Sequence, residues 1–208
     1  MSDKLNRLVW IDCEMTGLDP QIDQLVEIAT VVTDAELNVL DPGLDLIIRA
    51  DQSALDHMNE FVTRMHTTSG LIEEIPEGLP LAEAQQQTLD YVKQFVPEPG
   101  TAPLCGNTIG TDRMFIARYM PELDTYLHYR NIDVSTLKEL AHRWYPRAYF
   151  NAPEKKGGHR ALADILESIQ ELRYYRQAIL VEQPGPSSEQ AQAISAALTQ
   201  ASSASQPQ

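Results

Sequence analysis

The sequence predicts one α/β domain built on a mixed five-stranded β-sheet flanked by α-helices. Three apolar segments on short connections open the chain, a pattern typical of an antiparallel meander. Short strand-like and longer helix-like segments then alternate, which adds further strands through helical crossovers. No segment is repeated. With 208 residues, 43% of them hydrophobic, the chain can bury a sizeable core but has little room for a second domain.

The expected elements follow from apolar spacing and from the turn residues between them. The expected strands are residues 8–11, 25–33, 44–49, 103–107 and 131–134. The expected helices are short pieces within 53–75 and longer helices over 81–96, 112–120, 136–144 and 160–179. Thr111 and Ser135 stand where N-caps of two of these helices are expected.

The composition changes after residue 180. Of the 28 residues in 181–208, 21 are Gln, Ser, Ala or Pro. Such a segment buries too little apolar surface to fold on its own, although residues 190–198 could form a frayed helix. We therefore expect a folded domain over 1–180 and a disordered tail over 181–208.

The net charge of −14 restricts the function. A protein that follows a long nucleic acid needs a basic surface, so long nucleic acids are not expected partners. Short phosphate-containing substrates remain compatible with bound cations. No apolar run approaches the roughly 20 residues of a membrane span, and the first residues resemble neither a signal peptide nor a transit segment. The two cysteines, Cys13 and Cys105, form no disulfide framework, so we expect a cytoplasmic protein.

Two carboxylates stand at the end of the first expected strand. Side chains alternate across a strand, so Asp12 and Glu14 point to the same face and Cys13 points to the other, into the core. Two adjacent like charges favour a hard divalent cation, Mg²⁺ or Mn²⁺, between them. The alternative is a solvated pair in the turn before Gly17. Glu27, within the second strand, is more simply interpreted as the partner of an Arg or Lys than as a further ligand.

Three more residues complete a candidate site. Asp112 opens a helix after a strand, where an acidic residue also serves the helix dipole. His159 and Asp164 are five residues apart, about 500° of helical rotation, so they converge only if His159 lies on the loop before the helix. The glycines before His159 provide such a loop. The alternative is a histidine near a helix start and an unrelated exposed Asp164.

These residues together resemble a known family. Asp12-Cys13-Glu14, Asn107-x4-Asp112 and His159-x-Ala161-x-x-Asp164 are similar to the three motifs of the histidine-bearing branch of the DEDD exonuclease superfamily. Residues 10–18, 105–113, 128–140 and 171–176 further resemble the oligoribonuclease family within that branch. The resemblance covers about residues 5–180. It implies a ribonuclease H-like fold and a homodimer that shortens RNAs of two to five nucleotides from the 3′ end.

The expected chemistry is hydrolysis with two divalent metal ions that clamp the attacking and leaving oxygens at phosphorus. Asp12 would hold both ions, Glu14 and Asp164 would hold the ion beside the nucleophile, and Asp112 would fix the site from its helix. Neutral His159 would accept a proton from the attacking water. The product would be a nucleoside 5′-monophosphate.

The resemblance also implies how a short substrate is held, especially a 5′-phosphorylated dinucleotide. Leu18 would separate the two bases, and Phe61 and Tyr129 would stack on them. Tyr129 and Arg130 would come from the partner subunit, although a core or dimer-interface tyrosine is the alternative for Tyr129. The residues expected to bind the 5′ phosphate are Thr108, Arg130, Ser135 and Thr136. Phe61 stands where this family is expected to have Trp, and Thr108 where it is expected to have Ser.

Two other classes of protein share parts of this pattern. A proofreading-type DNA exonuclease would have the same five catalytic residues, but not the Tyr129-Arg130 segment, the Ser135-Thr136 pair or this acidity. A nucleotide-binding module without activity would be expected to lack a carboxylate or His159, and none is missing.

Overall fold

The computed structural model describes residues 6–154 and 158–204 and confirms the mixed five-stranded sheet flanked by helices. The strands are β1 (Leu8–Met15), β2 (Leu25–Thr33), β3 (Leu44–Ile47), β4 (Pro103–Gly106) and β5 (His128–Asp133). Their spatial order is β3-β2-β1-β4-β5. The first three are antiparallel neighbours, whereas β4 and β5 run parallel to β1. The predicted meander followed by crossovers is therefore correct.

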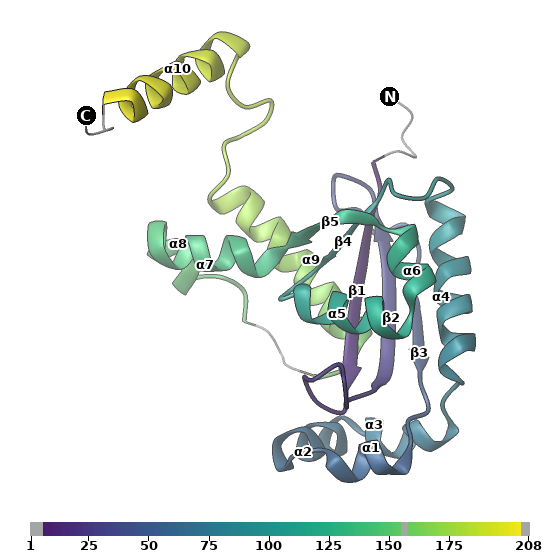
Figure 1. Cartoon of the computed structure of the whole chain (residues 1–208). Coiled ribbons are helices and arrows are strands. Elements are labelled where there is room, and N and C mark those ends of the chain that lie inside the picture. The colour runs from purple at the N-terminus through teal and green to yellow at the C-terminus, as the bar shows by residue number, and fades with distance from the viewer. Residues whose placement is uncertain (1–5, 155–157, 205–208) are drawn as a thin grey trace.

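The helices lie on both faces and at one end of the sheet (Figure 1). They are α1 (Gln52–His57), α2 (Glu60–Ser69), α3 (Leu71–Glu74), the 3₁₀ helix η2 (Ile75–Glu77), α4 (Leu81–Phe95), α5 (Gly110–Tyr119), α6 (Pro121–Tyr126), α7 (Val134–Trp144), α8 (Pro146–Phe150), α9 (Ala161–Ala178) and α10 (Ser188–Ala204). Helices α1 to α3 lie beyond the end of the sheet at which β1 finishes.

The alternation of β1 divides the core into two halves. Val9, Ile11 and Cys13 pack with residues of α4, α5 and α6 on one face. Trp10 packs with residues of α7 and α9 on the other. Because side chains alternate along a strand, Asp12 and Glu14 share the face of Trp10, toward α9. The prediction that Cys13 points into the core is confirmed, since it is 7% exposed.

Two predicted N-caps are wrong. Helix α5 begins at Gly110 rather than Asp112, and Thr111 lies inside its first turn. Thr108 turns the chain with a φ of 53°, so the helix starts before Thr111 is reached. Helix α7 is capped by Asp133 instead of Ser135. The Asp133 carboxylate accepts the backbone N–H of Ser135.

The chain after residue 180 contains α10, whose residues 188–200 are exposed. In Figure 1 this helix extends away from the sheet and its covering helices. The domain division at residue 180 and the disorder of 181–208 stay predictions. Within the described residues, no helix combines the length and the apolar character that crossing a membrane requires.

Candidate active site

Strand β1 carries the first two carboxylates of the candidate site. The strand extends to Met15, beyond its predicted end at residue 11, so Asp12 and Glu14 lie within it. Glu14 is 7% exposed, and Asp12 is half-buried. The pairing with β2 is regular up to Glu14 and shifts between Glu14 and Met15. The backbone therefore holds both carboxylates rigidly, on one face, at the last regular positions of the central strand.

The start of α9 brings two more groups to Glu14. The ligand atoms of Glu14, His159 and Asp164 all lie within 4.8 Å of one another. His159 precedes α9 and has a φ of 48°, a left-handed conformation that is uncommon outside glycine. Asp164 lies in the first turn of the helix. The histidine is thus on the loop and the aspartate on the helix, as their spacing of five predicts.

Asp112 reaches the site from the opposite face of the sheet. Its Oδ1 accepts the backbone N–H of Cys13, the residue between Asp12 and Glu14, at 3.0 Å. Asp112 is 6% exposed. It is not among the three residues whose ligand atoms converge. In the described structure its carboxylate holds the β1 backbone.

The accumulated negative charge perturbs the site. Burial, with the neighbouring Glu27, Asp164 and Asp112 carboxylates, raises the pKa of Glu14 to about 8. Burial likewise raises the pKa of Asp112 to about 7. A divalent cation would relieve this repulsion, and two carboxylates with an imidazole are suitable ligands for Mg²⁺ or Mn²⁺. The residues present therefore fit a metal site.

An ion-pair cluster anchors the loop that carries His159. Arg160 donates from Nε to Glu27 at 2.9 Å and from a terminal nitrogen to Glu74 of α3 at 2.7 Å. The second oxygen of Glu27 accepts the N–H of Ala161 at 3.2 Å. The Glu27 side chain is fully buried. The prediction that Glu27 pairs with an Arg or Lys is confirmed, and the pair ties the start of α9 to β2.

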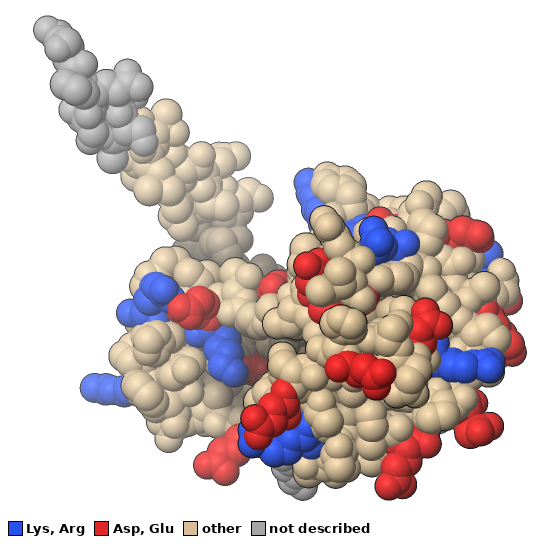
Figure 2. Space-filling view, turned by 60° about the horizontal axis from the view of Figure 1, so that its bottom comes forward, with Lys and Arg blue, Asp and Glu red and all other residues tan. Residues whose placement is uncertain are grey.

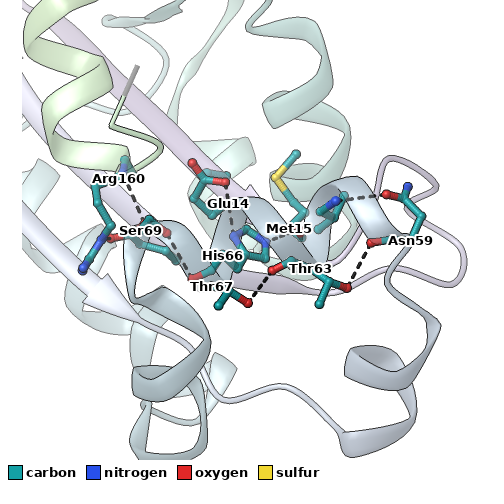
Figure 3. A network of polar contacts seen from close by, with 12 residues as sticks. Glu14, Met15, Asn59, Thr63, His66, Thr67, Ser69 and Arg160 are labelled. Atoms are coloured by element: carbon teal, nitrogen blue, oxygen red, sulfur yellow. Dashed lines mark hydrogen bonds and ion pairs between the residues drawn. The ribbon is translucent and has the colours of Figure 1, made fainter. Parts of the chain in front are cut away.

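His66 is a site residue that the sequence analysis did not identify. Figure 3 shows it on α2, pointing toward Glu14 at the end of β1. Its Nε2 lies 2.9 Å from the carbonyl oxygen of Met15 and therefore carries the proton, while Nδ1 faces a Glu14 oxygen at 3.9 Å. The side chain is fully buried. Its only signal in the sequence is its place four residues after Val62, on the buried side of a short helix.

A pocket of about 380 Å³ opens beside Glu14. Its walls come from the turn after β1 and from α2. The lining residues are Cys13, Glu14, Met15, Gly17, Leu18, Asn59, Phe61, Val62 and Met65. Leu18 and Phe61, which line this pocket, are 73% and 61% exposed. An apolar surface of this kind suits the faces of a nucleobase.

The residues expected to bind the 5′ phosphate form two separate groups. Thr108 and Ser135 are adjacent, with their hydroxyl oxygens 3.2 Å apart, and Thr136 follows on the exposed side of α7. Arg130 lies elsewhere, over the ring of Tyr129 at 5.4 Å on the edge strand β5. Tyr129 is 74% exposed, so it is not a core residue.

Tyr129 and Arg130 cannot reach the carboxylates of their own chain. Leu104 of β4 pairs with Val9 of β1 and with Asn131 of β5, and a register shift follows toward Pro103 and His128, so Arg130 lies near the level of Leu8 and Val9. Glu14 is six residues further along β1, about 20 Å, and two strand spacings add about 10 Å across the sheet. The structure brings together Glu14, His159 and Asp164, and separately Thr108 and Ser135, but it leaves Tyr129 and Arg130 apart from both.

The surface at the end of the molecule where β1 finishes and α1 to α3 lie is mixed in charge. Figure 2, turned to bring that end forward, shows Asp and Glu side chains spread across the face. Lys and Arg occur among them in separate small groups on the face shown.

Comparison with known proteins identifies the family of the sequence. A family model described as Exonuclease matches residues 9–172. A protein named Oligoribonuclease from Leifsonia xyli subsp. xyli is 68% identical over 200 residues, covering 96% of this chain and 97% of that protein. Its namesakes from Streptomyces avermitilis and Mycobacterium avium are 63% and 57% identical, covering 92% and 97% of this chain and 96% and 94% of theirs.

Solved structures support the fold at much lower identity. An exonuclease I whose structure suggests how processivity is achieved aligns with a TM-score of 0.65 at 14% identity. The exonuclease I of Methylocaldum szegediense aligns with a TM-score of 0.62 at 19% identity. Each alignment covers 84% of this chain and 41% of the larger protein. At such identities the likeness is one of fold, and it supports the predicted ribonuclease H-like fold.

Proposed function

The chain belongs to the oligoribonuclease family of 3′–5′ exoribonucleases, and from this premise we propose that it hydrolyses 5′-phosphorylated dinucleotides and other very short RNAs with two divalent metal ions. The observation that carries the proposal is the convergence of the ligand atoms of Glu14, His159 and Asp164 within 4.8 Å, next to a pocket with exposed Leu18 and Phe61. A cytoplasmic location is part of the proposal.

The metal site would be formed by Asp12, Glu14, Asp112 and Asp164. Two ions bound there would stabilise the charge on the attacking and leaving oxygens of an in-line displacement at phosphorus. Glu14 and Asp164 would offer oxygen ligands from β1 and α9, and Asp12 shares the face of Glu14. Asp112 would support the site by holding the backbone N–H of Cys13.

His159 is the proposed general base. It is exposed and lies on a loop, so its neutral imidazole can approach a water molecule beside Glu14 and Asp164. The water attacks the last phosphodiester, the 3′ oxygen of the penultimate nucleotide leaves, and a nucleoside 5′-monophosphate is released. Leu18 would separate the two bases, and Phe61 would stack on one of them. Phe61 offers a smaller ring than the Trp expected in the family.

Dimerisation would complete the site. Tyr129 and Arg130 are exposed on the edge strand β5, about 20 Å along the sheet from Glu14 of their own chain, so a role at the substrate requires a second subunit. The unpaired edge of β5 and the exposed Trp144 and Phe150 of the adjacent helices α7 and α8 are surfaces that favour such an association. Arg130 would then join Thr108, Ser135 and Thr136 at the 5′ phosphate.

Substrate length tests the proposal. A terminal phosphate carries more charge than an internal phosphodiester and leaves no chain to be accommodated, so 5′-phosphorylated dinucleotides should be cleaved much faster than ten-nucleotide RNAs. The measurement is kcat/KM with Mn²⁺ on 5′-labelled RNAs of two to twenty nucleotides. A wild-type protein indifferent to length would contradict the substrate proposal, and one inactive with Mn²⁺ and with Mg²⁺ would contradict the mechanism.

Subunit mixing tests the shared site. Arg130→Ala removes the group offered to the partner, whereas Asp164→Ala removes a ligand of the chain's own site. When the two inactive variants are mixed and allowed to exchange subunits, each hybrid dimer regains one site with neither change. Recovery of activity on dinucleotides is the expected result. No recovery, with exchange verified by native mass spectrometry, would show that Arg130 serves its own chain.

A further inference from the structure

A polar chain, buried at Ser168 and Glu171, links the proposed 5′-phosphate site to the helix that carries Asp164. It consists of Thr108, Ser135, Asn107, Ser168, Glu171 and Lys138, from the turn after β4 and from α7 and α9. None of these contacts is needed for the catalytic chemistry itself. One end of this polar chain lies on α9, which carries the proposed metal ligand Asp164. The other end consists of the Thr108 and Ser135 hydroxyl groups at the proposed phosphate site.

The hydrogen bonds of Asn107 fix the direction of its amide. Its Nδ2 donates to Ser168 Oγ at 2.8 Å and to Glu171 Oε2 at 3.1 Å. Because an ionised carboxylate only accepts, the opposite amide orientation would place two acceptors against each other. The carbonyl oxygen Oδ1 therefore points to Ser135, whose hydroxyl donates to it at 3.0 Å.

The orientation of Ser135 then determines what the neighbouring groups can offer. Its single hydroxyl proton is engaged with Asn107, so its oxygen acts as an acceptor for the N–H of Thr108 at 2.9 Å. The same N–H also lies 3.0 Å from Asp133 Oδ1. These contacts hold Thr108 in its left-handed conformation, with φ at 53°, and turn its hydroxyl outward beside that of Ser135.

The other end of the chain is anchored in α9 and α7. Glu171 is 6% exposed and pairs with Lys138 Nζ at 3.3 Å, which compensates a charge that would be costly to bury alone. Ser168, which accepts from Asn107, donates its own proton to the carbonyl oxygen of Asp164 at 2.8 Å. The loop of Thr108 is thereby held at a constant position relative to the first turns of α9.

We propose that Asn107 and Glu171 are positioning residues that set the distance between the Thr108 loop, at the proposed 5′-phosphate site, and the metal ligands, and so select substrates two nucleotides long with a 5′ phosphate. This inference rests on the proposed function and deepens it. Neither residue touches the reacting atoms. Their effect is on where Thr108 and Ser135 stand when Asp164 engages the scissile phosphate.

A donor–acceptor exchange tests the proposal. Asn107→Asp places a carboxylate against Glu171, and Glu171→Gln removes the charge that faces Lys138. In the double variant, Asp at 107 accepts from Gln at 171, so the link between β4 and α9 is restored with its polarity reversed, while Ser135 keeps its acceptor. Gln170→Ala, at an exposed position of the same helix, is the matched control.

The informative quantity is the ratio of kcat/KM for 5′-phosphorylated over 5′-hydroxyl RNA dinucleotides, measured with Mn²⁺. Asn107→Asp should lower this ratio about tenfold, mainly by raising KM for the phosphorylated substrate, since hydrogen bonds to a charged phosphate are misaligned. Glu171→Gln, which keeps one acceptor for Asn107 and loses only the charge that faces Lys138, should lower it less. The double variant should recover part of the ratio, and Gln170→Ala should not change it. Calorimetric titration of the substrate-free proteins should give an unchanged Mn²⁺ affinity.

The outcomes separate this inference from the proposed function. A wild-type protein without any preference for a 5′ phosphate would refute the proposed function. A wild-type preference that both single variants retain would refute the positioning role alone, as would an equal loss on the two substrates. If Asn107→Asp does not fold, Glu171→Leu carries the test by itself, because it removes both acceptors facing Asn107 while keeping a side chain of similar size.

Discussion

Replacing Arg160 by alanine should destabilise the fold and disturb the candidate site at once. Arg160 is the only cation whose side chain the described structure pairs with Glu27, and Glu27 lies fully buried on β2. The change removes the Nε hydrogen bond of 2.9 Å to Glu27 and the contact of 2.7 Å to Glu74. The hydrogen bond that Glu27 accepts from the N–H of Ala161, at 3.2 Å, survives.

The magnitude follows from these contacts. Removing one partner of a buried ion pair costs about 3–5 kcal/mol. Arg160 is itself 30% exposed and Ala161 still donates, so we expect a loss near the lower end, about 3 kcal/mol. For a chain of this length, that loss lowers the Tm by about 6–12 °C. Arg143→Ala, which breaks a pair with Glu139 whose members are 57% and 61% exposed, should cost less than about 1 kcal/mol.

The effect should depend on pH in a defined direction. Burial already raises the pKa of Glu27, and Arg160 is the main group that opposes this shift. In Arg160→Ala the folded-state pKa of Glu27 therefore rises further above its unfolded value. A group with a raised pKa loses its contribution to stability as the pH rises through that pKa. The deficit relative to the wild type should consequently be larger at pH 8 than at pH 5.

Urea unfolding at the two pH values, with Arg143→Ala as control, measures both effects. In parallel, kcat should fall more than KM rises, because Arg160 is next to His159 and holds the loop on which it lies. A loss of stability no larger than that of Arg143→Ala would refute the importance of the buried pair. A deficit that shrinks toward pH 8 would refute the assigned direction of the Glu27 pKa.

Three further outcomes are expected. The pKa values of Glu14 and Asp112 are raised to about 8 and about 7, so without metal the protein should lose stability as the pH rises through this range. The Tm in EDTA should therefore fall from pH 6 to pH 8.5, and the Tm gain on adding Mn²⁺ should grow over the same range. A Tm gain independent of pH would contradict a site that releases protons when metal binds. Asp164→Ala should abolish the Mn²⁺ binding measured by calorimetry. His159→Ala should keep most of the Mn²⁺ affinity and lower kcat about 10²–10⁴-fold. Equal losses of Mn²⁺ affinity in the two variants would show that the histidine is a ligand. Phe61→Ala should raise KM for dinucleotides with little change in Mn²⁺ affinity, and Phe61→Trp should lower KM; an unchanged KM in both would separate Phe61 from the base.

Much of the site was predictable because its signals are local. The apolar run 8–11 identifies the central strand, and alternation places Asp12 and Glu14 on one face whatever the rest of the chain does. The spacing of His159 and Asp164 likewise requires a loop followed by a helix, which the structure has. A buried charge on a strand needs a partner, so Glu27 could be assigned an Arg or Lys before that residue was known.

The identities of the distant partners came only from the tertiary structure. Glu27 and Arg160 are 133 residues apart, Cys13 and Asp112 are 99 apart, and Asn107 and Glu171 are 64 apart. The predicted cap of α5 failed for a related reason, since the turn at Thr108 is held by Asp133 at the end of β5 and by Ser135 of α7. Periodicity and capping preferences are set by neighbours within a few residues, so a single sequence carries them. Which polar groups meet across the core depends on how the sheet twists and how the helices pack on it, and those positions are decided by the folded chain as a whole.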